Sequence, residues 1–451
     1  YLDDIGAKFL WECNAPMFTY TANLIPEIAD SIVEIDNAMR WGFAREVGIF
    51  DAWDAIGVEK SVNKMKEENR KVPTWVDEML AAGRKSFYEI KNGEMTYWCP
   101  VEKKSLVYAQ NKKVLNLNLY KDTKNTIKRD WSASIHDIGD GVLNVEFHSI
   151  FVPAFNPLDR SMNDIMKHAL DLLETGKYKG LVVGHQGKNW CAGANVNDFK
   201  MAIDSGNLQV MDAGVKDMQN VTQRIRHSKY PVVTCPFNLA LGGGFEFYAC
   251  SSHTVASGEL YAGLVEAIQG LIPGAGGHLR VLLNLLENND AKNVNMNIGR
   301  QAIELINPMT VSRSATDALK KGWLRKSDTI VMNSEHLLAV GKSKVLEMSD
   351  AGYEPPKYRD DLTLPGMTLR TMASVGAKAM KAQGKISDHD ELVNSKSAYV
   401  LSGGKQGGLM SKVDEQHVLD IERECFMSLA GEPKTQARIA HFLKTGKPLR
   451  N

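Results

Sequence analysis

The stretch 239–257, LALGGGFEFYACSSHTVAS, places three consecutive glycines directly before Phe245 and Glu246. Glycine weakens both strands and helices, so a cluster of glycines indicates a backbone that approaches another group closely. The extended run before the glycines is expected to become helical near Gly243, where N–H groups of the first helical turn have no partner within the helix. The sequence therefore predicts a helix N-terminus that offers backbone donors, with a carboxylate in its first turn.

A second loop has the same character. The segment 184–199, GHQGKNWCAGANVNDF, follows a short apolar strand predicted at 181–183, and the glycine cluster follows another predicted at 232–234. Each loop leaves backbone N–H groups free at a strand-to-helix turn. Two such groups that meet on one oxygen form an oxyanion hole, in which loss of one donor costs about 10²–10³ in turnover.

A second glutamate changes the interpretation of the first. Glu246 alone is explained by the preference of carboxylates for a helix N-terminus. Glu266, however, lies in the apolar run of 261–277, YAGLVEAIQGLIPGAGG, where a carboxylate has to be paired, exposed or functional. Two such groups favour acid–base chemistry.

Three motifs carry a resemblance to a known family: CAGAN at 191–195, ALGGGFEF at 240–247 and VEAIQGLIPGAGG at 265–277. Together they resemble the crotonase superfamily over roughly residues 140–345, and the two glutamates resemble its enoyl-CoA hydratase branch. The resemblance implies an α/β crotonase domain, the ClpP/crotonase-like ββα superhelix. It also implies an acyl-CoA thioester as substrate, with coenzyme A arriving as part of that substrate and no cofactor or metal needed for hydration.

The resemblance also implies roles for individual residues. The oxyanion N–H groups are assigned to Ala194 and Gly243. Glu246 is expected to orient and activate a water molecule, and Glu266 to deliver a proton. Contacts with the substrate and its coenzyme A are expected from four further residues: Ala192, Asn195, Val196 and Gly242.

The sequence departs from the family pattern at four positions. Asn195 stands where aspartate is common, Ser251 where aspartate often follows the AC pair, and His278 where a small hydroxyl residue is frequent. Phe245 is bulkier than the usual residue, which is compatible with a narrower acyl pocket. None of these changes removes a core catalytic group.

The two ends resemble other parts of fatty-acid β-oxidation proteins. Residues 32–65 resemble the carboxy-terminal helical domain of 3-hydroxyacyl-CoA dehydrogenases, in which a segment like GIFDAWDAIG packs the helices. Residues 386–404 and 434–451 resemble the end of bacterial bifunctional proteins that carry dehydrogenase first and hydratase second. We therefore expect the C-terminal portion of such a protein, beginning in mid-pattern at Tyr1, with NAD required only by a dehydrogenase domain upstream.

Four segments are predicted from these patterns. An all-α domain of the dehydrogenase C-terminal type spans 1–90, a β-rich connector spans 91–134, the crotonase domain spans 135–345, and a helical C-terminal extension spans 346–451. Alternation of Leu115, Leu117 and Leu119 with asparagines is the period-two signal of a strand, so a small hairpin or a connector between domains is expected here.

Composition excludes several functions. Among 451 residues, Lys+Arg and Asp+Glu are both 54, which argues against nucleic acid as a partner. No apolar run reaches the length of a membrane helix, so no membrane insertion is expected. The six scattered cysteines favour a reduced, cytoplasmic protein. A homo-oligomer or a β-oxidation complex is a further expectation.

In the tail, His417 with Glu415, Glu422 and Glu424 is compatible with a metal site, but a solvated helix face is favoured.

Two alternatives to a hydratase stay open. An enoyl-CoA isomerase, or another crotonase reaction, would use the same oxyanion hole, although isomerases usually manage with one acid–base group. A non-catalytic scaffold of a β-oxidation assembly would not need either glutamate.

Overall fold

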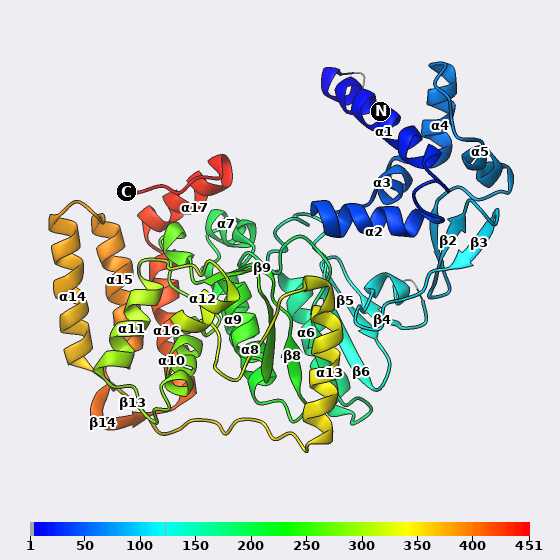
Figure 1. The fold of residues 1–451 in the computed structure, drawn as a ribbon. Helices are drawn as coiled ribbons and strands as arrows, with labels where there is room; N and C mark the ends of the chain where they lie inside the picture. Colours follow the sequence, from blue (N-terminus) through cyan, green and yellow to red (C-terminus); the bar gives the residue numbers. More distant parts are fainter. Residues whose placement is uncertain (1–3, 122) are drawn as a thin grey trace. The chain divides into compact units, whose positions relative to one another are not determined.

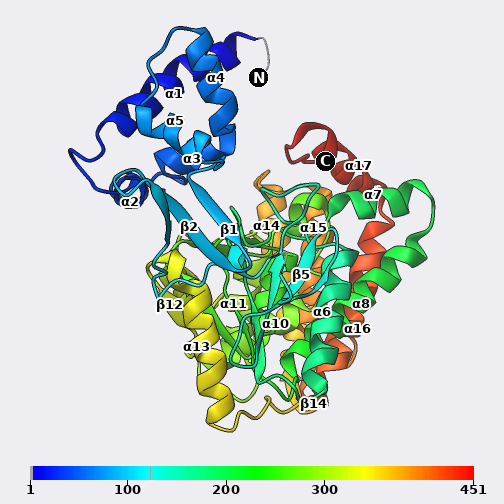
Figure 2. The ribbon, with the colours of Figure 1, turned by 90° about the vertical axis from the view of Figure 1, so that its right-hand side faces the viewer.

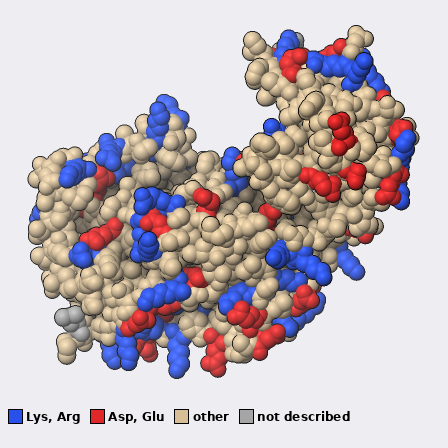
Figure 3. Space-filling model, in the orientation of Figure 1, with Lys and Arg blue, Asp and Glu red and all other residues tan. Residues whose placement is uncertain are grey.

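The computed structural model describes residues 4–121 and 123–451, which form two compact units. One unit comprises Tyr1–Asn111 and Asn118–Thr123, and the other comprises Lys112–Leu117 and Lys124–Asn451. Figure 3 shows basic and acidic side chains interspersed over the visible surface, as the equal numbers of the two charges lead one to expect. Within the described ranges, none of the helices is long and apolar enough to cross a membrane.

The first unit combines five helices with a small antiparallel sheet. Its helices are α1(Ile5–Asn23), α2(Ile32–Phe43), α3(Ile49–Ile56), α4(Val58–Glu67) and α5(Thr74–Ala81). Its sheet has the order β1-β2-β3, with β1(Tyr88–Lys91), β2(Glu94–Cys99) and β3(Lys104–Val107).

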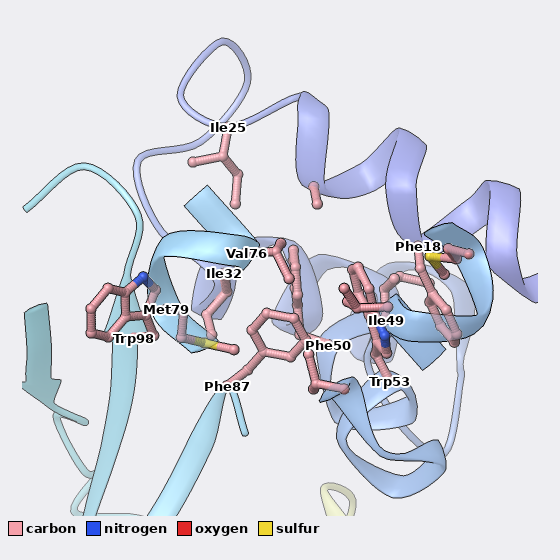
Figure 4. Packing of buried hydrophobic residues seen from close by; sticks show 14 of the residues in the cluster. Phe18, Ile25, Ile32, Ile49, Phe50, Trp53, Val76, Met79, Phe87 and Trp98 are labelled. Atoms are coloured by element: carbon pink, nitrogen blue, oxygen red, sulfur yellow. The ribbon is translucent and has the colours of Figure 1, made fainter. Parts of the chain in front are cut away.

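An aromatic cluster forms the core of this unit (Figure 4). The ring of Trp53 stacks on Phe18 with centroids 5.1 Å apart, and Phe87 contacts both Trp53 and Phe50. The Asp54 carboxylate accepts hydrogen bonds from the N–H groups of Phe87 and Tyr88, at 2.6 and 2.9 Å, and so links α3 to β1. The expectation that GIFDAWDAIG packs the helices is therefore confirmed, since Phe50 and Trp53 are buried at its centre.

The second unit is built on a seven-stranded sheet with the order β12-β10-β8-β7-β6-β5-β4. The five strands from β12 to β6 run parallel, whereas β4 and β5 are antiparallel to their neighbours. The strands of this sheet are β4(Thr126–Arg129), β5(Ala133–Asp137), β6(Val142–Phe147), β7(Gly180–Val183), β8(Val232–Thr234), β10(His253–Ser257) and β12(Thr329–Val331). Beside the sheet, β9(Asn238–Leu241) pairs in parallel with β11(Leu260–Gly263).

Both faces of this sheet are covered. Helix α13(Leu337–Asp350) packs on β7, where a Cβ built on Gly180 or Gly184 would lie within 2.6 Å of Val345 or Leu338. Successive side chains of a strand point to opposite faces. Phe147 of β6 lies on the other face and contacts Phe247 of α9(Gly243–Ala249), the helix that carries Glu246.

The remaining helices surround the sheet and extend away from it (Figures 1 and 2). Helix α6(Arg160–Glu174) packs on the sheet, α8(Leu208–Arg226) packs on α6, and α7(Val196–Asp204) packs on α8. Helix α12(Ala315–Lys321) contacts β11, whereas α10(Gly277–Asn288) and α11(Met296–Ile306) lie against the C-terminal group (Figure 1). The C-terminal group is α14(Met367–Ala382), α15(Asp388–Leu401), α16(Glu415–Ala430) and α17(Pro433–Thr445), with the short hairpin β13(Leu362–Leu364) and β14(Gly408–Val413). Three short 3₁₀ turns are η1(Leu117–Leu119), η2(Glu266–Gln269) and η3(Ser334–His336).

The short apolar runs and the glycine cluster predicted the local structure correctly, whereas the alternating leucines did not. The apolar strands predicted at 181–183 and 232–234 are confirmed as β7 and β8, and α9 begins at Gly243 as predicted. The strand predicted from Leu115 to Leu119 is wrong: η1 lies there, and it buries Leu117. The N–H of Leu117 donates to Gln186 Oε1 at 2.9 Å instead of to a strand partner. The predicted division of the chain into domains at 1–90, 91–134, 135–345 and 346–451 stays a prediction. The two compact units are defined by contacts in space, which do not mark the boundaries of evolutionary domains.

Candidate active site

Backbone hydrogen bonds hold three segments side by side. The N–H of Cys191 donates to Leu239 O and the N–H of Leu241 donates to Cys191 O, both at 3.0 Å. The N–H of Gly242 then donates to Gly263 O at 2.8 Å, which adds the segment that leads into η2. The CAGAN loop, the glycine cluster and the turn that carries Glu266 are thus fixed to one another through their main chains.

This close approach requires glycine at positions 242 and 244. A Cβ on Gly244 would lie 2.3 Å from Cys191 O, and a Cβ on Gly243 would lie 3.5 Å from the nitrogen of Ala194. Gly242 has φ +52°, which side chains rarely adopt, and its Cβ would lie 2.9 Å from Glu266 Oε1. The glycine cluster therefore brings the main chain of α9 against both the Ala194 loop and the Glu266 carboxyl.

Two N–H groups are left uncommitted at this junction. Among the hydrogen bonds of residues 4–121 and 123–451, none is donated by the N–H of Ala194 or of Gly243. The neighbouring N–H groups of Ala192 and Asn195 are used, since they donate to Phe155 O and Leu158 O. An unpaired N–H at the start of a helix also carries the positive end of the helix dipole, so the pair suits a negatively charged oxygen.

A cavity of about 440 Å³ opens at this junction. It is lined by all eight residues predicted for the site: Ala192, Ala194, Asn195, Val196, Gly242, Gly243, Glu246 and Glu266. The structure therefore brings together backbone donors and two carboxyl groups from segments that are up to 72 positions apart in the sequence, counted from Ala194 to Glu266.

Glu246 is fixed by the turn that leads into α10. Its Oε1 accepts hydrogen bonds from the N–H groups of Ala275 and Gly277, at 2.8 and 2.7 Å, and its side chain is only 3% exposed. Among the described residues no hydrogen bond engages its second oxygen. Burial raises the pKa of Glu246 well above its usual value, and the negative charges of Glu266 and Glu422 act in the same direction.

Glu266 is held differently. It begins η2, it is half-buried, and its Oε2 is shielded from solvent without a hydrogen-bond partner in the described chain. Burial raises the pKa of Glu266 to about 7, and the charge of Glu422 also raises it. Because both carboxyls resist ionisation, the pair retains a proton near neutral pH.

The solvated helix face predicted for the tail is wrong for Glu415 and Glu422, which are both fully buried. The Oε1 of Glu422 accepts from the N–H of Gly276 at 2.7 Å, and its Oε2 accepts from the N–H and the Nδ1 of His278, at 2.9 and 2.8 Å. Sequence reasoning missed this carboxyl because charge was taken as a sign of exposure. The signal was present: with Val418, Cys425 and Leu429, Glu422 shares the buried stripe of α16 at helical spacing.

The C-terminal helices also supply cavity wall that sequence reasoning missed. Phe426 of α16 and Phe442 and Leu443 of α17 line the cavity, together with Leu239 and Leu241 beside the glycine cluster. These apolar side chains make a surface suited to an acyl chain.

The expectation that Phe245 narrows the pocket is wrong. Phe245 is fully buried against Tyr248 and Trp323, with ring centroids 5.3 and 4.8 Å away, and it is not among the residues that line the cavity. Because α9 turns this side chain toward the interior, its size does not limit the space beside Glu246.

The fold agrees with comparison to known proteins. Residues 152–288 match the family model described as enoyl-CoA hydratase/isomerase. The chain therefore contains a crotonase-family enoyl-CoA hydratase/isomerase domain, and it is homologous to fatty-acid oxidation multifunctional proteins.

Two relatives illustrate the likeness. A Bacillus subtilis (strain 168) protein named "Probable 3-hydroxyacyl-CoA dehydrogenase" is 39% identical over 451 residues, which are 100% of this chain and 56% of that protein. A peroxisomal fatty acid beta-oxidation multifunctional protein of Oryza sativa subsp. japonica is 29% identical over 143 residues, 32% of this chain and 19% of that protein. The chain thus spans about half the length of the curated relatives that it matches from end to end.

Solved structures share the fold. A carnitinyl-CoA dehydratase from Mycobacterium thermoresistibile has a TM-score of 0.51 at 15% identity, covering 70% of this chain and 91% of that one. An enoyl-CoA hydratase from Rhodobacter sphaeroides 2.4.1 has a TM-score of 0.50 at 16% identity, covering 71% and 92%. At this level of identity the likeness concerns the fold alone.

Proposed function

We propose that the domain is an enoyl-CoA hydratase that adds water across the 2,3 double bond of a 2-enoyl-CoA thioester to give a 3-hydroxyacyl-CoA. The observation that carries the proposal is that two carboxyls with raised pKa values and two unpaired N–H groups line one cavity. Hydration needs both kinds of group at the same place. An isomerase needs only one carboxyl, so the pair favours hydration.

The reaction follows from the positions of these groups. The thioester oxygen accepts hydrogen bonds from the N–H groups of Ala194 and Gly243, while a water lies between the two carboxyls. The oxygen of this water bonds to Cβ as its proton passes to the ionised carboxylate, and the double-bond electrons move onto the thioester as an enolate. Fixed N–H dipoles stabilise that charge without reorganisation. The protonated carboxyl then delivers its proton to Cα, so that one H₂O has been added.

We further propose that the whole protein is bifunctional, with an NAD-dependent 3-hydroxyacyl-CoA dehydrogenase as its other activity. The name of the Bacillus subtilis relative and the resemblance of residues 32–65 support this part. Dehydrogenation of the 3-hydroxyl group is a reaction that directly consumes the hydration product.

The test is hydration of crotonyl-CoA, followed as loss of the absorbance of the conjugated thioester. Wild type, Glu246→Gln and Glu266→Gln are compared, with the exposed Glu304→Gln as the matched control for the change of charge. We expect hydration by wild type and by Glu304→Gln, and losses of about 10²–10⁴ in the two cavity variants. Wild-type inactivity on both short and long enoyl-CoAs would favour a scaffold, and migration of a 3,4 double bond without hydration would favour an isomerase.

A further inference from the structure

The turn 275–278 is held from two sides by two different glutamates. Its four consecutive N–H groups alternate between them: Ala275 and Gly277 donate to Glu246, whereas Gly276 and His278 donate to Glu422. Glu246 belongs to the segment that matches the hydratase/isomerase family, but Glu422 belongs to α16, far outside residues 152–288.

Glu422 is itself held by a buried chain of polar groups. His278 Nδ1 lies 2.8 Å from Glu422 Oε2, and His278 Nε2 lies 3.1 Å from Ser397 Oγ of α15. Glu422 and His278 are both 0% exposed. Glu422 accepts three hydrogen bonds, two from the main chain and one from His278, which is the pattern of an ionised carboxylate.

We infer that Glu422 and His278 are a positioning pair for the cavity, fixing the turn that holds Glu246 and keeping a negative charge beside both reactive carboxyls. The inference rests on the proposed hydratase function. It adds that α16, which carries Glu422, is needed for full activity. Neither residue lines the cavity, so the pair acts through Glu246 and Glu266 and does not touch the substrate.

The charge of Glu422 has a defined effect. It raises the pKa of Glu246 and of Glu266, so that a proton stays on the pair at higher pH. Titratable groups around Glu422 include His278 of α10 and the buried Cys425 thiol on its own helix, whose pKa burial raises to about 11, and the charged Lys396 of α15 lies close enough to act on Cys425. The side chain that α15 offers to this network is the uncharged Ser397. Loss of the charge therefore lowers the pH at which the cavity carboxyls ionise.

The first experiment compares the pH profile of kcat for crotonyl-CoA hydration in wild type and Glu422→Gln. The exposed Glu424→Gln on the same helix is the matched control. We expect both limbs of the Glu422→Gln profile to move to lower pH by about one unit, with KM little changed, and no movement in Glu424→Gln. A profile that keeps its position in a folded Glu422→Gln protein overturns the inference, even if the rate falls.

A second pair of variants does not require a change of charge. In His278→Asn the amide nitrogen occupies the place of Nδ1 and retains the donor to Glu422, whereas His278→Gln retains only the contact with Ser397. We expect kcat to fall about tenfold in His278→Gln and to be largely preserved in His278→Asn. Equal rates in the two variants contradict the positioning role, whether or not Glu422→Gln folds.

A readout without catalysis separates this inference from the proposed function. ¹³C NMR of protein labelled at glutamate carboxyls, with Glu246→Gln and Glu266→Gln used for assignment, follows the ionisation of the pair directly. A shift to lower pH in Glu422→Gln together with inactive wild type would reject the hydratase and retain the inference. Active wild type with an unshifted carboxyl titration would reject the inference and retain the hydratase.

Discussion

The two segments that carry the cavity carboxyls differ in what holds them. Helix α9, with Glu246, is buried throughout, and two main-chain N–H groups from the 275–278 turn fix one oxygen of its carboxylate. The 3₁₀ turn η2, with Glu266, is half-buried, and α17 holds it from outside: Arg438 donates to Ala267 O and Thr435 donates to Gly270 O. A carboxyl with a fixed oxygen suits the alignment of a water, whereas one with an unpaired oxygen suits proton transfer.

The largest expected effect comes from Glu246→Gln. The amide oxygen can keep the hydrogen bonds from the N–H groups of Ala275 and Gly277, but the acid–base group is lost, so we expect kcat to fall about 10⁴-fold with little change in KM. Steady-state hydration of crotonyl-CoA measures this, and thermal unfolding checks that the variant is folded. A fall smaller than that of Glu266→Gln would reverse the ranking of the two segments.

Glu266→Gln is expected to cost less, about 10²-fold in kcat. This side chain makes no hydrogen bond through Oε2, so the amide breaks no contact there and only proton transfer is lost. Solvent exchange at Cα provides the sharper measurement: in D₂O, deuterium incorporation at Cα of the 3-hydroxyacyl-CoA should slow with hydration. Exchange at the wild-type rate would mean that Glu266 does not handle the Cα proton.

The pH dependence tests whether the two carboxyls act as one unit. Burial raises the pKa of Glu266 to about 7 and also raises that of Glu246, so acidification below pH 7 protonates Glu266 and reduces the base available to the pair. We expect kcat to rise with pH up to about 7, by at most tenfold per unit, and to fall again at higher pH when the second proton leaves. A profile that is flat between pH 5 and 8 would show that the carboxyls have ordinary pKa values.

The smallest effect is expected from Thr435→Val, which keeps the shape of the side chain but removes the hydroxyl that donates to Gly270 O at 2.9 Å. We expect a loss of about 1 kcal/mol in the free energy of unfolding and a fall of about threefold in kcat, with Thr445→Val on the exposed end of α17 as control. A double-mutant cycle sharpens the comparison, because the effect on kcat should vanish with Glu266→Gln and persist with Glu246→Gln. If Thr435→Val lowers kcat equally in both backgrounds, α17 does not act through η2.

The sequence predicted those parts of the site that depend on the main chain. Runs of glycine at the end of apolar strands indicate loops that approach one another, and the cavity is indeed lined by the eight residues that these motifs named. The chemical roles of Glu246, Glu266, Ala194 and Gly243 stay predictions until the variants are measured. Strands β7 and β8 could also be predicted, since each is a short apolar run buried on both faces.

Contributions from distant segments could not be predicted in the same way. Phe426 and Phe442 look like ordinary core residues, because helical spacing says which face is buried and not what it is buried against. Glu422 was assigned to solvent because an isolated charge usually lies there, and its partners are about 145 positions earlier in the chain. The strand predicted at Leu115 failed for a related reason: the partner of Leu117 is a side chain, Gln186, and not another strand.

The alternation of donors along the 275–278 turn limits how the gene for such a protein can be recombined. In a chimera that joined this sheet to the last helices of a homologue without a carboxylate in place of Glu422, the N–H groups of Gly276 and His278 would lose their acceptor. The turn and α16 therefore have to be exchanged together, although some 140 codons separate them. Swaps that move both together should retain turnover, and swaps that divide them should yield proteins that fold but work slowly.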